Sequence, residues 1–107
     1  MPRSGAAVGW LLLGQTLSME RAELERRLRG LGDSVADRLT CEQATWFAEF
    51  VGVGEYGLAL EMLADWLSED ALPISEAELG EATSLATAMG IAERVTSPLR
   101  LCPRPRA

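Results

Sequence analysis

The sequence predicts an all-α fold: a small bundle of three to five helices with short turns and an irregular C-terminal tail. Apolar residues recur at helical spacing almost throughout the chain, and no alternating strand pattern or Asn-Gly hairpin turn occurs. The 107 residues, 48% of them hydrophobic, are enough for one core and leave little room for a second domain. We divide the chain into an apolar N-terminal segment (1–18), a helical domain (19–93) and a Pro/Arg-rich tail (94–107).

The first helix is expected over residues 19–31, with Ser18 as a possible N-cap. Two Glu–Arg pairs spaced four residues apart support it, and Gly30 and Gly32 suit its end. The leucines that share its apolar face are Leu17, Leu24, Leu28 and Leu31.

The second helix is expected from Thr40 to about Val53. Thr40 and Gln43 have the spacing of a capping box, in which each side chain accepts a hydrogen bond from the other residue's backbone N–H. The apolar face of this helix comprises Ala44, Phe47, Ala48 and Val51, widened by Trp46, Phe50 and Val53.

The third helix is expected over residues 55–70, after a break at Gly52–Gly54. The connection is only two to three residues long, so the second and third helices should pack antiparallel. The residues that share the core-facing side are Tyr56, Ala59, Leu60, Leu63 and Leu67.

A second capping box, Ser75 with Glu78, predicts the start of the fourth helix. Gly90 supplies the left-handed residue that ends it, and Ile91 the accompanying apolar contact. Its buried stripe is expected to comprise Leu79, Ala82, Ala86 and Met89. Residues 96–107 contain three prolines and no periodic pattern, so we expect a tail.

Two features bear on the cellular compartment. The apolar run 6–14 is too short to span a bilayer and lacks a convincing cleavage site, which favours a packed N-terminal helix or a non-native extension. Cys41 and Cys102 form no Cys-x-x-Cys motif, and we expect two free thiols in a cytoplasmic protein.

The composition excludes most catalytic chemistry. The chain has no histidine, so the usual general base and commonest metal ligand are missing. All ten basic residues are arginine, which removes Schiff-base and P-loop lysines. We therefore expect a protein that is not an enzyme and that has no catalytic residue, no cofactor and no metal.

The charge is unevenly distributed. Residues 39–93 contain eleven carboxylates and no basic residue, whereas residues 94–107 contain four arginines and no acid. An acidic block of this kind repels nucleic acid and anionic lipid and attracts a basic protein. The alternative is a surface that only keeps the protein soluble.

Other sites are disfavoured on the same grounds. Carboxylates one turn apart, such as Asp65 and Glu69, invite a di-iron site, but those bundles use Glu-x-x-His motifs. The segment 65–75 lacks the glycine and the oxygen-rich pattern of a calcium loop. Cys41 has no base beside it, and the arginines of the first helix alternate with glutamates rather than forming a basic stripe.

Protein binding is the class of function that remains. A strip on the third helix offers apolar anchors among carboxylates, as interfaces do. The residues we expect to bind a partner are Glu55, Leu58, Glu61, Met62, Asp65, Trp66, Glu69 and Asp70. An equally weighted alternative is that Leu58, Met62 and Trp66 contact the N-terminal segment inside the fold.

The segment 50–69 resembles the MafI-like family of bacterial immunity proteins. Its sequence is Phe-Val-Gly-Val-Gly-Glu-Tyr-Gly-Leu-Ala-Leu-Glu-Met-Leu-Ala-Asp-Trp-Leu-Ser-Glu, and the resemblance extends over about residues 40–91, through Pro73-Ile74-Ser75 and Met89-Gly90. It implies a small helical cytoplasmic protein that binds a cognate polymorphic toxin, in many cases a nuclease with a basic cleft. Glu55, Glu61, Asp65 and Glu69 would then be candidates to contact the toxin.

The sequence thus favours an immunity protein that neutralises a basic toxin through an acidic helical surface. The alternative is a general helical interaction module or homodimer that uses the same strip and has no toxin partner. We expect neither a nucleic acid nor a membrane as partner. The interpretation depends on exposed carboxylates, and it fails if arginines from the two ends of the chain cap them and leave the outer surface near neutral.

Overall fold

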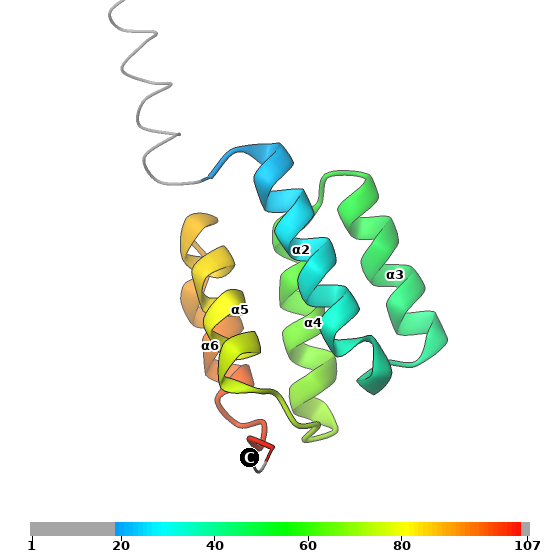
Figure 1. Ribbon diagram of the computed structural model, residues 1–107, viewed down its shortest axis with the longest axis vertical. Coiled ribbons are helices and arrows are strands. Elements are labelled where there is room, and N and C mark those ends of the chain that lie inside the picture. The colour runs from blue at the N-terminus through cyan, green and yellow to red at the C-terminus, as the bar shows by residue number, and fades with distance from the viewer. Residues whose placement is uncertain (1–18, 106–107) are drawn as a thin grey trace, which may run out of the picture.

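The computed structural model describes residues 19–105, which form a bundle of five α-helices and one short 3-10 helix (Figure 1). No strand occurs among these residues. The all-α prediction is therefore confirmed for the described part of the chain. The helices are α2 (Arg21–Val35), η1 (Ala36–Arg38), α3 (Cys41–Gly52), α4 (Tyr56–Glu69), α5 (Glu76–Ala88) and α6 (Ala92–Leu99).

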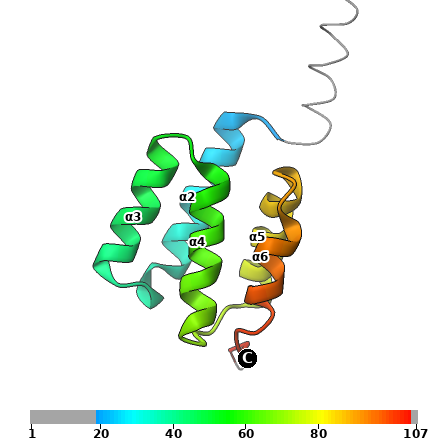
Figure 2. The ribbon, with the colours of Figure 1, turned by 180° about the vertical axis from the view of Figure 1, so that it is seen from behind.

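The helices lie in two layers, with α4 at the centre. One layer contains α3, α4 and α6, and the other contains α2 and α5 (Figures 1 and 2). Helix α4 contacts each of the other four α-helices. Helices α3 and α4 are antiparallel, as the short connection between them requires. The outer face of the α3–α4–α6 layer is turned toward the reader in Figure 2.

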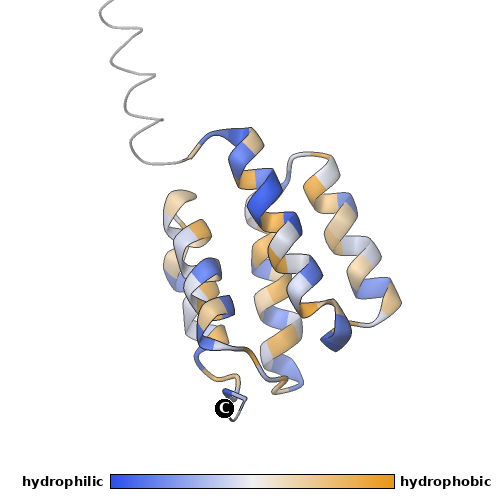
Figure 3. Cartoon of the chain, viewed as in Figure 1, coloured by the Kyte–Doolittle hydropathy of each residue, from blue (hydrophilic) through white to orange (hydrophobic). Residues whose placement is uncertain are grey.

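One core holds the two layers together. All five residues expected on the inner face of α4 are buried, and Leu24, Leu28 and Leu31 of α2 face them. Figure 3 shows apolar positions in orange along both helices. Many of the other positions of α2 are among the most hydrophilic of the chain and are drawn in dark blue. Burying a leucine of this kind contributes roughly 1.5–3 kcal/mol. The other buried apolar residues are Val35 of α2, Ala64 of α4, and Phe47, Val51, Ile74, Ala82, Leu85, Ala86, Val95, Leu99 and Cys102.

Both predicted capping boxes form. The Thr40 hydroxyl accepts a hydrogen bond from the backbone N–H of Gln43 at 3.0 Å, and the Gln43 side chain accepts one from the N–H of Thr40. Ser75 and Glu78 bond in the same reciprocal way. These bonds satisfy N–H groups that have no acceptor within the helix, which is why each helix begins where it does.

The C-terminal ends of α5 and α3 also follow from the sequence. Gly90 has a φ of 74°, and the N–H of Ile91 donates to the carbonyl of Ala86 at 2.9 Å, which is the expected Schellman ending. Gly54, with a φ of 85°, makes the turn between α3 and α4. Both positions need a conformation that other residues rarely adopt.

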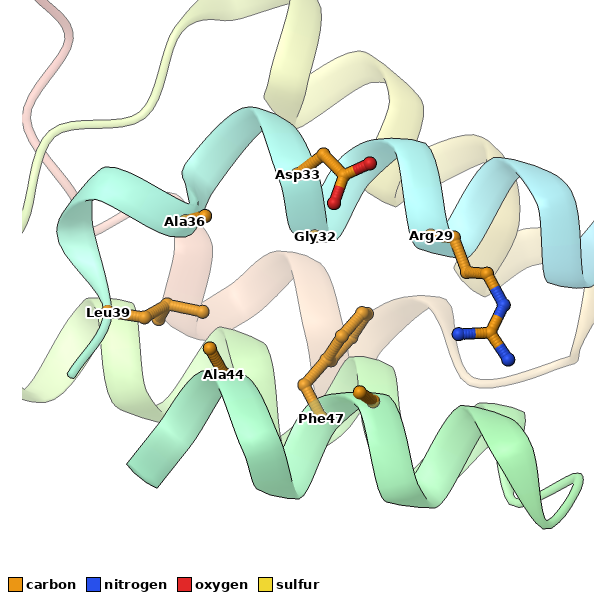
Figure 4. A pocket seen from close by; sticks show the side chains of 8 residues that line it. Arg29, Gly32, Asp33, Ala36, Leu39, Ala44 and Phe47 are labelled. Atoms are coloured by element: carbon orange, nitrogen blue, oxygen red, sulfur yellow. The ribbon is translucent and has the colours of Figure 1, made fainter. Parts of the chain in front are cut away.

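Helix α2 corrects one expectation. It does not stop at Gly30 or Gly32 but continues to Val35. Gly32 is buried against α3, where a Cβ atom would lie 2.5 Å from Cε2 of Phe47. The glycine therefore serves close packing rather than helix termination, and Figure 4 shows the Phe47 ring rising from α3 toward it.

Helix α2 begins at Arg21, with Glu20 as its N-cap, so the expected start at residue 19 with Ser18 as N-cap is wrong. Leu17 and Ser18 themselves lie outside the described residues.

The C-terminal region also differs from the prediction of an irregular tail. Residues 92–99, partly assigned to the tail, form α6, with Pro98 inside its last turn. Val95 and Leu99, spaced by four residues, are buried against α4 and α5 together with Thr96. After α6, the carbonyl of Pro103 accepts a hydrogen bond from the N–H of Ile74 at 2.9 Å. Irregular structure therefore begins at residue 100, later than expected.

The two cysteines are free thiols, as expected; Cys41 is exposed and Cys102 buried. The apolar run 6–14 lies outside the described residues. Among the helices that the structure describes, none combines the length and the apolar character needed to cross a membrane.

Candidate functional site: the acidic face of α3 and α4

Ion pairs that α2 and η1 form with α5 neutralise part of the acidic block. Arg38 donates to both carboxylate oxygens of Glu78, at 2.7 and 2.9 Å, and to the carbonyl of Pro73. Arg27 forms a similar two-pronged contact with Glu81, at 2.8 and 2.6 Å. Bidentate pairs of this kind are stronger and better oriented than single ion pairs. The α2–α5 side of the molecule is therefore held together by its charges.

Arginines from the C-terminal region neutralise two more carboxylates. Arg94 on α6 donates to Glu61 at 3.0 Å, and Arg104 donates to Glu76 at 3.1 Å. The block cannot neutralise its own acids, because it contains no basic residue, but arginines from outside it neutralise some of them. Arginines from both ends of the chain pair with four of the eleven acids, because the fold brings α2 and the C-terminal region against α4 and α5.

The other seven acids of the block form no ion pair with any residue in the range 19–105. All but one of them belong to α3, to α4 or to the residues that flank α4. They are Glu42, Glu49, Glu55, Asp65, Glu69, Asp70 and, on α6, Glu93. The negative charge therefore remains, but it is confined to one part of the surface.

The structure separates the eight predicted partner-binding residues into three groups. Glu61 lies on the α6 side of α4 and is paired with Arg94, so it is not a free carboxylate. Glu55 and Leu58 line a shallow hollow at one end of the bundle. The third group lies on the outer face and the C-terminal end of α4 and comprises Met62, Asp65, Trp66, Glu69 and Asp70.

Exposure differs within that third group. Asp65, Glu69 and Asp70 are exposed, whereas Met62 and Trp66 are half-buried, and Trp66 packs against the core. Leu58, in the second group, is 40% exposed. The structure thus places acidic groups outside and apolar groups beneath them, as expected for an interface strip, but over a shorter stretch of α4 than predicted.

Helix α3 has an exposed apolar surface that the sequence did not predict. Trp46 and Val53 were assigned to the apolar face that points into the core, yet they are 48% and 75% exposed. The rings of Trp46 and Phe50 are in contact, with centroids 5.9 Å apart. The helical spacing contains the signal: at about 100° per residue, Trp46 and Val53 point away from the side that Phe47 and Val51 occupy.

A small pocket of about 180 Å³ lies between α2 and α3 (Figure 4). The ring of Phe47 and the side chain of Leu39 line it, and Arg29 and Asp33 project from α2. Arg29 is already bonded to Glu25, at 2.9 and 3.1 Å. Asp33 forms no ion pair with the described residues, but it is the only carboxylate that lines the pocket, and the rest of the lining is mostly apolar.

The strongest pKa shifts lie on the α2–α5 side. The Arg38 guanidinium lowers the pKa of Glu78 to about 2, and Glu78 in turn raises the pKa of Arg38. Arg27 lowers the pKa of Glu81. These shifts come from structural ion pairs and favour the charged form of each group, so they stabilise the fold rather than prepare an acid or a base.

Within residues 19–105, no three acidic or cysteine side chains lie close enough together to hold a metal ion. Comparison with known proteins found no match to a protein family, to a curated protein or to a solved structure. The assignment of function therefore depends on the chemistry of the surface itself.

Proposed function

We propose that this protein binds a basic protein partner through the outer surface of α3 and α4, and that it acts as an immunity protein that neutralises a toxin. The observation that carries the proposal is the uneven pairing of charges. Arginines neutralise the acids on α5, whereas Asp65, Glu69 and Asp70 are exposed and form no ion pair with the described residues. An exposed field of one sign steers a partner of the opposite sign toward the surface.

The position of these acids supports a role outside the fold. Asp65, Glu69 and Asp70 lie in or just after the last two turns of α4, and no basic residue occurs in its last turn. Carboxylates at a helix C-terminus interact unfavourably with the helix dipole, and Asp65 and Glu69 are also like charges one turn apart. Stability alone does not account for this arrangement, whereas binding to a cationic surface does.

The toxin-neutralising role comes from the resemblance of residues 40–91 to MafI-like immunity proteins. A toxin whose cleft binds nucleic acid carries the positive charge that this surface would meet. In such a complex, close pairs of opposite charge couple by about 1.5–7 kcal/mol, although desolvation offsets part of this gain. Inhibition would follow from occupation of the cleft and requires no catalytic group in this chain.

The test is co-expression with the product of the adjacent upstream gene. We expect a stoichiometric complex and rescue of cells from that product. The variant Asp65→Lys/Glu69→Lys should slow association at low salt, whereas Glu93→Lys on α6 should change it little. If the neighbouring gene encodes no toxin, or if the purified proteins do not associate, the immunity role is wrong.

A general interaction module that pairs with a second copy of itself is the alternative. Light scattering distinguishes the two functions, because only the alternative requires a stable dimer that buries Leu58, Met62 and Trp66.

A further inference from the structure

Helix α3 has an outer surface that nothing in the described chain covers. Only Phe47 and Val51 of its residues are buried, whereas Trp46 and Val53 are substantially exposed. A tryptophan on the outside of an edge helix is a frequent anchor of protein interfaces, because it offers a large rigid surface. Trp46 is therefore a candidate anchor for a binding partner.

The contacts of α3 show which flank faces which helix. Ala44 and Ala48 line the pocket against α2. At about 100° per residue, Trp46 and Phe50 then lie on the opposite flank, the one that faces α4. The rings of Trp46 and Phe50, which contact one another in a tilted arrangement, therefore border the seam between α3 and α4.

The contacts of α4 define its two flanks in the same way. Glu61 pairs with Arg94, and Gly57 lies against Ile91, so the flank that carries both residues faces α6. Met62 and Trp66 lie on the other flank, toward α3. We call the resulting surface the α3–α4 seam; its apolar members are Trp46, Phe50, Met62 and Trp66.

Carboxylates flank the seam on both helices. Glu42 and Glu49 lie one turn before and one turn after Trp46, and Asp65 and Glu69 lie beside Trp66. None of them forms an ion pair with a residue in 19–105. A second copy of the chain would place like charges opposite one another, and nucleic acid or anionic lipid would be repelled. The occupant must therefore be cationic.

We propose that the α3–α4 seam binds arginine side chains of a basic protein segment, with Trp46 as the anchor. This inference rests on the proposed function in one respect, namely that the partner is a protein. A guanidinium can stack on the Trp46 ring while it donates two parallel hydrogen bonds to a neighbouring carboxylate such as Glu42 or Glu49. Lysine provides a point charge and cannot make this combined contact.

The experiment uses two synthetic amphipathic peptides as probes. They have the same length and leucine positions, and one carries arginine wherever the other carries lysine. Titration calorimetry of the full-length protein should give a Kd for the arginine peptide that is about threefold to tenfold lower. Backbone NMR shifts should change mainly in α3 and α4, and little in α5.

Three variants identify the anchor. Trp46→Ala should abolish the preference for arginine, and Trp46→Phe should retain part of it, because an aromatic plane remains. Leu101→Ala is the matched control, since Leu101 is 76% exposed but lies outside the seam. Circular dichroism establishes that each variant is folded; Trp46→Phe serves as the second test if Trp46→Ala loses its helical signal.

Equal affinities for the two peptides, an unchanged preference in Trp46→Ala, or NMR shifts centred on α2 and α5 would each overturn the inference. Its failure is distinguishable from that of the proposed function. If Asp65→Lys/Glu69→Lys weakens the toxin complex but Trp46→Ala does not, only the inference is wrong. If the peptides behave as expected but no toxin complex forms, only the immunity role is wrong.

Discussion

The α2–α5 side and the α3–α4 seam both contain carboxylates but use them in opposite ways. On the first, Glu78 and Glu81 are engaged by Arg38 and Arg27 through pairs of hydrogen bonds. On the second, the carboxylates form no ion pair within the described chain and lie around the exposed ring of Trp46 and the half-buried rings of Phe50 and Trp66. An acidic composition alone therefore does not identify a binding surface. What defines it is which acids the fold leaves without arginines.

Glu78 should be the most sensitive carboxylate of the protein. Its side chain is 11% exposed, pairs with Arg38, accepts a hydrogen bond from Ser34, and completes the capping box with Ser75. Glu78→Ala removes all of these contacts and leaves Arg38 without its partner. We expect a loss of about 3 kcal/mol in the free energy of unfolding, measured with urea.

Two further variants serve as controls for this prediction. Glu78→Gln keeps a residue able to complete the capping box and should lose less. Asp65→Ala, on the seam, should change stability by no more than about 0.5 kcal/mol. Equal losses in Glu78→Ala and Asp65→Ala would show that the two regions do not differ as the structure indicates.

The α2–α5 side should also govern acid stability. The pKa of Glu78 is about 2 in the folded protein and near 4.5 when the residue is free, so the folded state holds its proton less tightly. The stabilisation from this pair is present above about pH 4.5 and is lost as the pH falls toward 2. Glu81, whose pKa is also lowered, contributes in the same direction.

Urea unfolding at a series of pH values between 6 and 2.5, as approximate limits, measures this effect. The wild-type curve should fall steeply on the acid side, and Glu78→Gln and Arg38→Gln should both flatten it, because each variant lacks the same pair. A slope that stays the same in both variants would mean that other carboxylates control acid unfolding.

Local signals in the sequence predicted most of the fold. The capping boxes at Thr40 and Ser75 and the Schellman ending at Gly90 are short-range chemistry, so they form wherever the surrounding helix does. Helix α6 was missed because Pro98 argues against a helix. Its stability comes from burial of Val95 and Leu99 between α4 and α5, which depends on residues far away in the sequence.

The candidate site was predictable only in part, for the same reason. The acidic end of α4 could be identified from residue spacing alone. Which acids remain free could not, since the partners of Glu61 and Glu78 lie 33 and 40 residues away in the sequence. The exposed side of Trp46 was also hidden, because a helix that is apolar on several sides gives no unique inner face.

Gly30 and Gly32 provide a matched pair for the packing of α2 on α3. At Gly32 a new Cβ atom would meet the Phe47 ring, whereas at Gly30 nothing lies within 4 Å. Gly32→Ala should therefore destabilise the protein by about 1–2 kcal/mol as the ring is displaced. Gly30→Ala should stabilise it by about 0.5–1 kcal/mol, because alanine favours the helix.

Thermal unfolding of the two variants gives opposite shifts in Tm if this packing is correct. A neutral Gly32→Ala would mean that the ring of Phe47 can move into the pocket beside it at no cost. The pair thus tests whether α3 is fixed against α2, on which the orientation of Trp46 depends.

The smallest expected effect is a change in stability at Glu69, and it tests directly whether the acids of the α3–α4 seam differ from those of the α2–α5 side. Glu69 ends α4, where its charge opposes the helix dipole and repels Asp65, and it forms no ion pair with the described residues. Glu69→Arg should therefore stabilise the protein by about 0.5 kcal/mol while it weakens binding of a basic partner. Glu93→Arg, at the start of α6, should have the opposite effect on stability, because a carboxylate is favourable there. Both shifts in Tm should shrink as salt is added, since the charges are exposed. If Glu69→Arg instead destabilises the protein, Glu69 has a partner within the fold, and the acids of the seam are structural like those of α5.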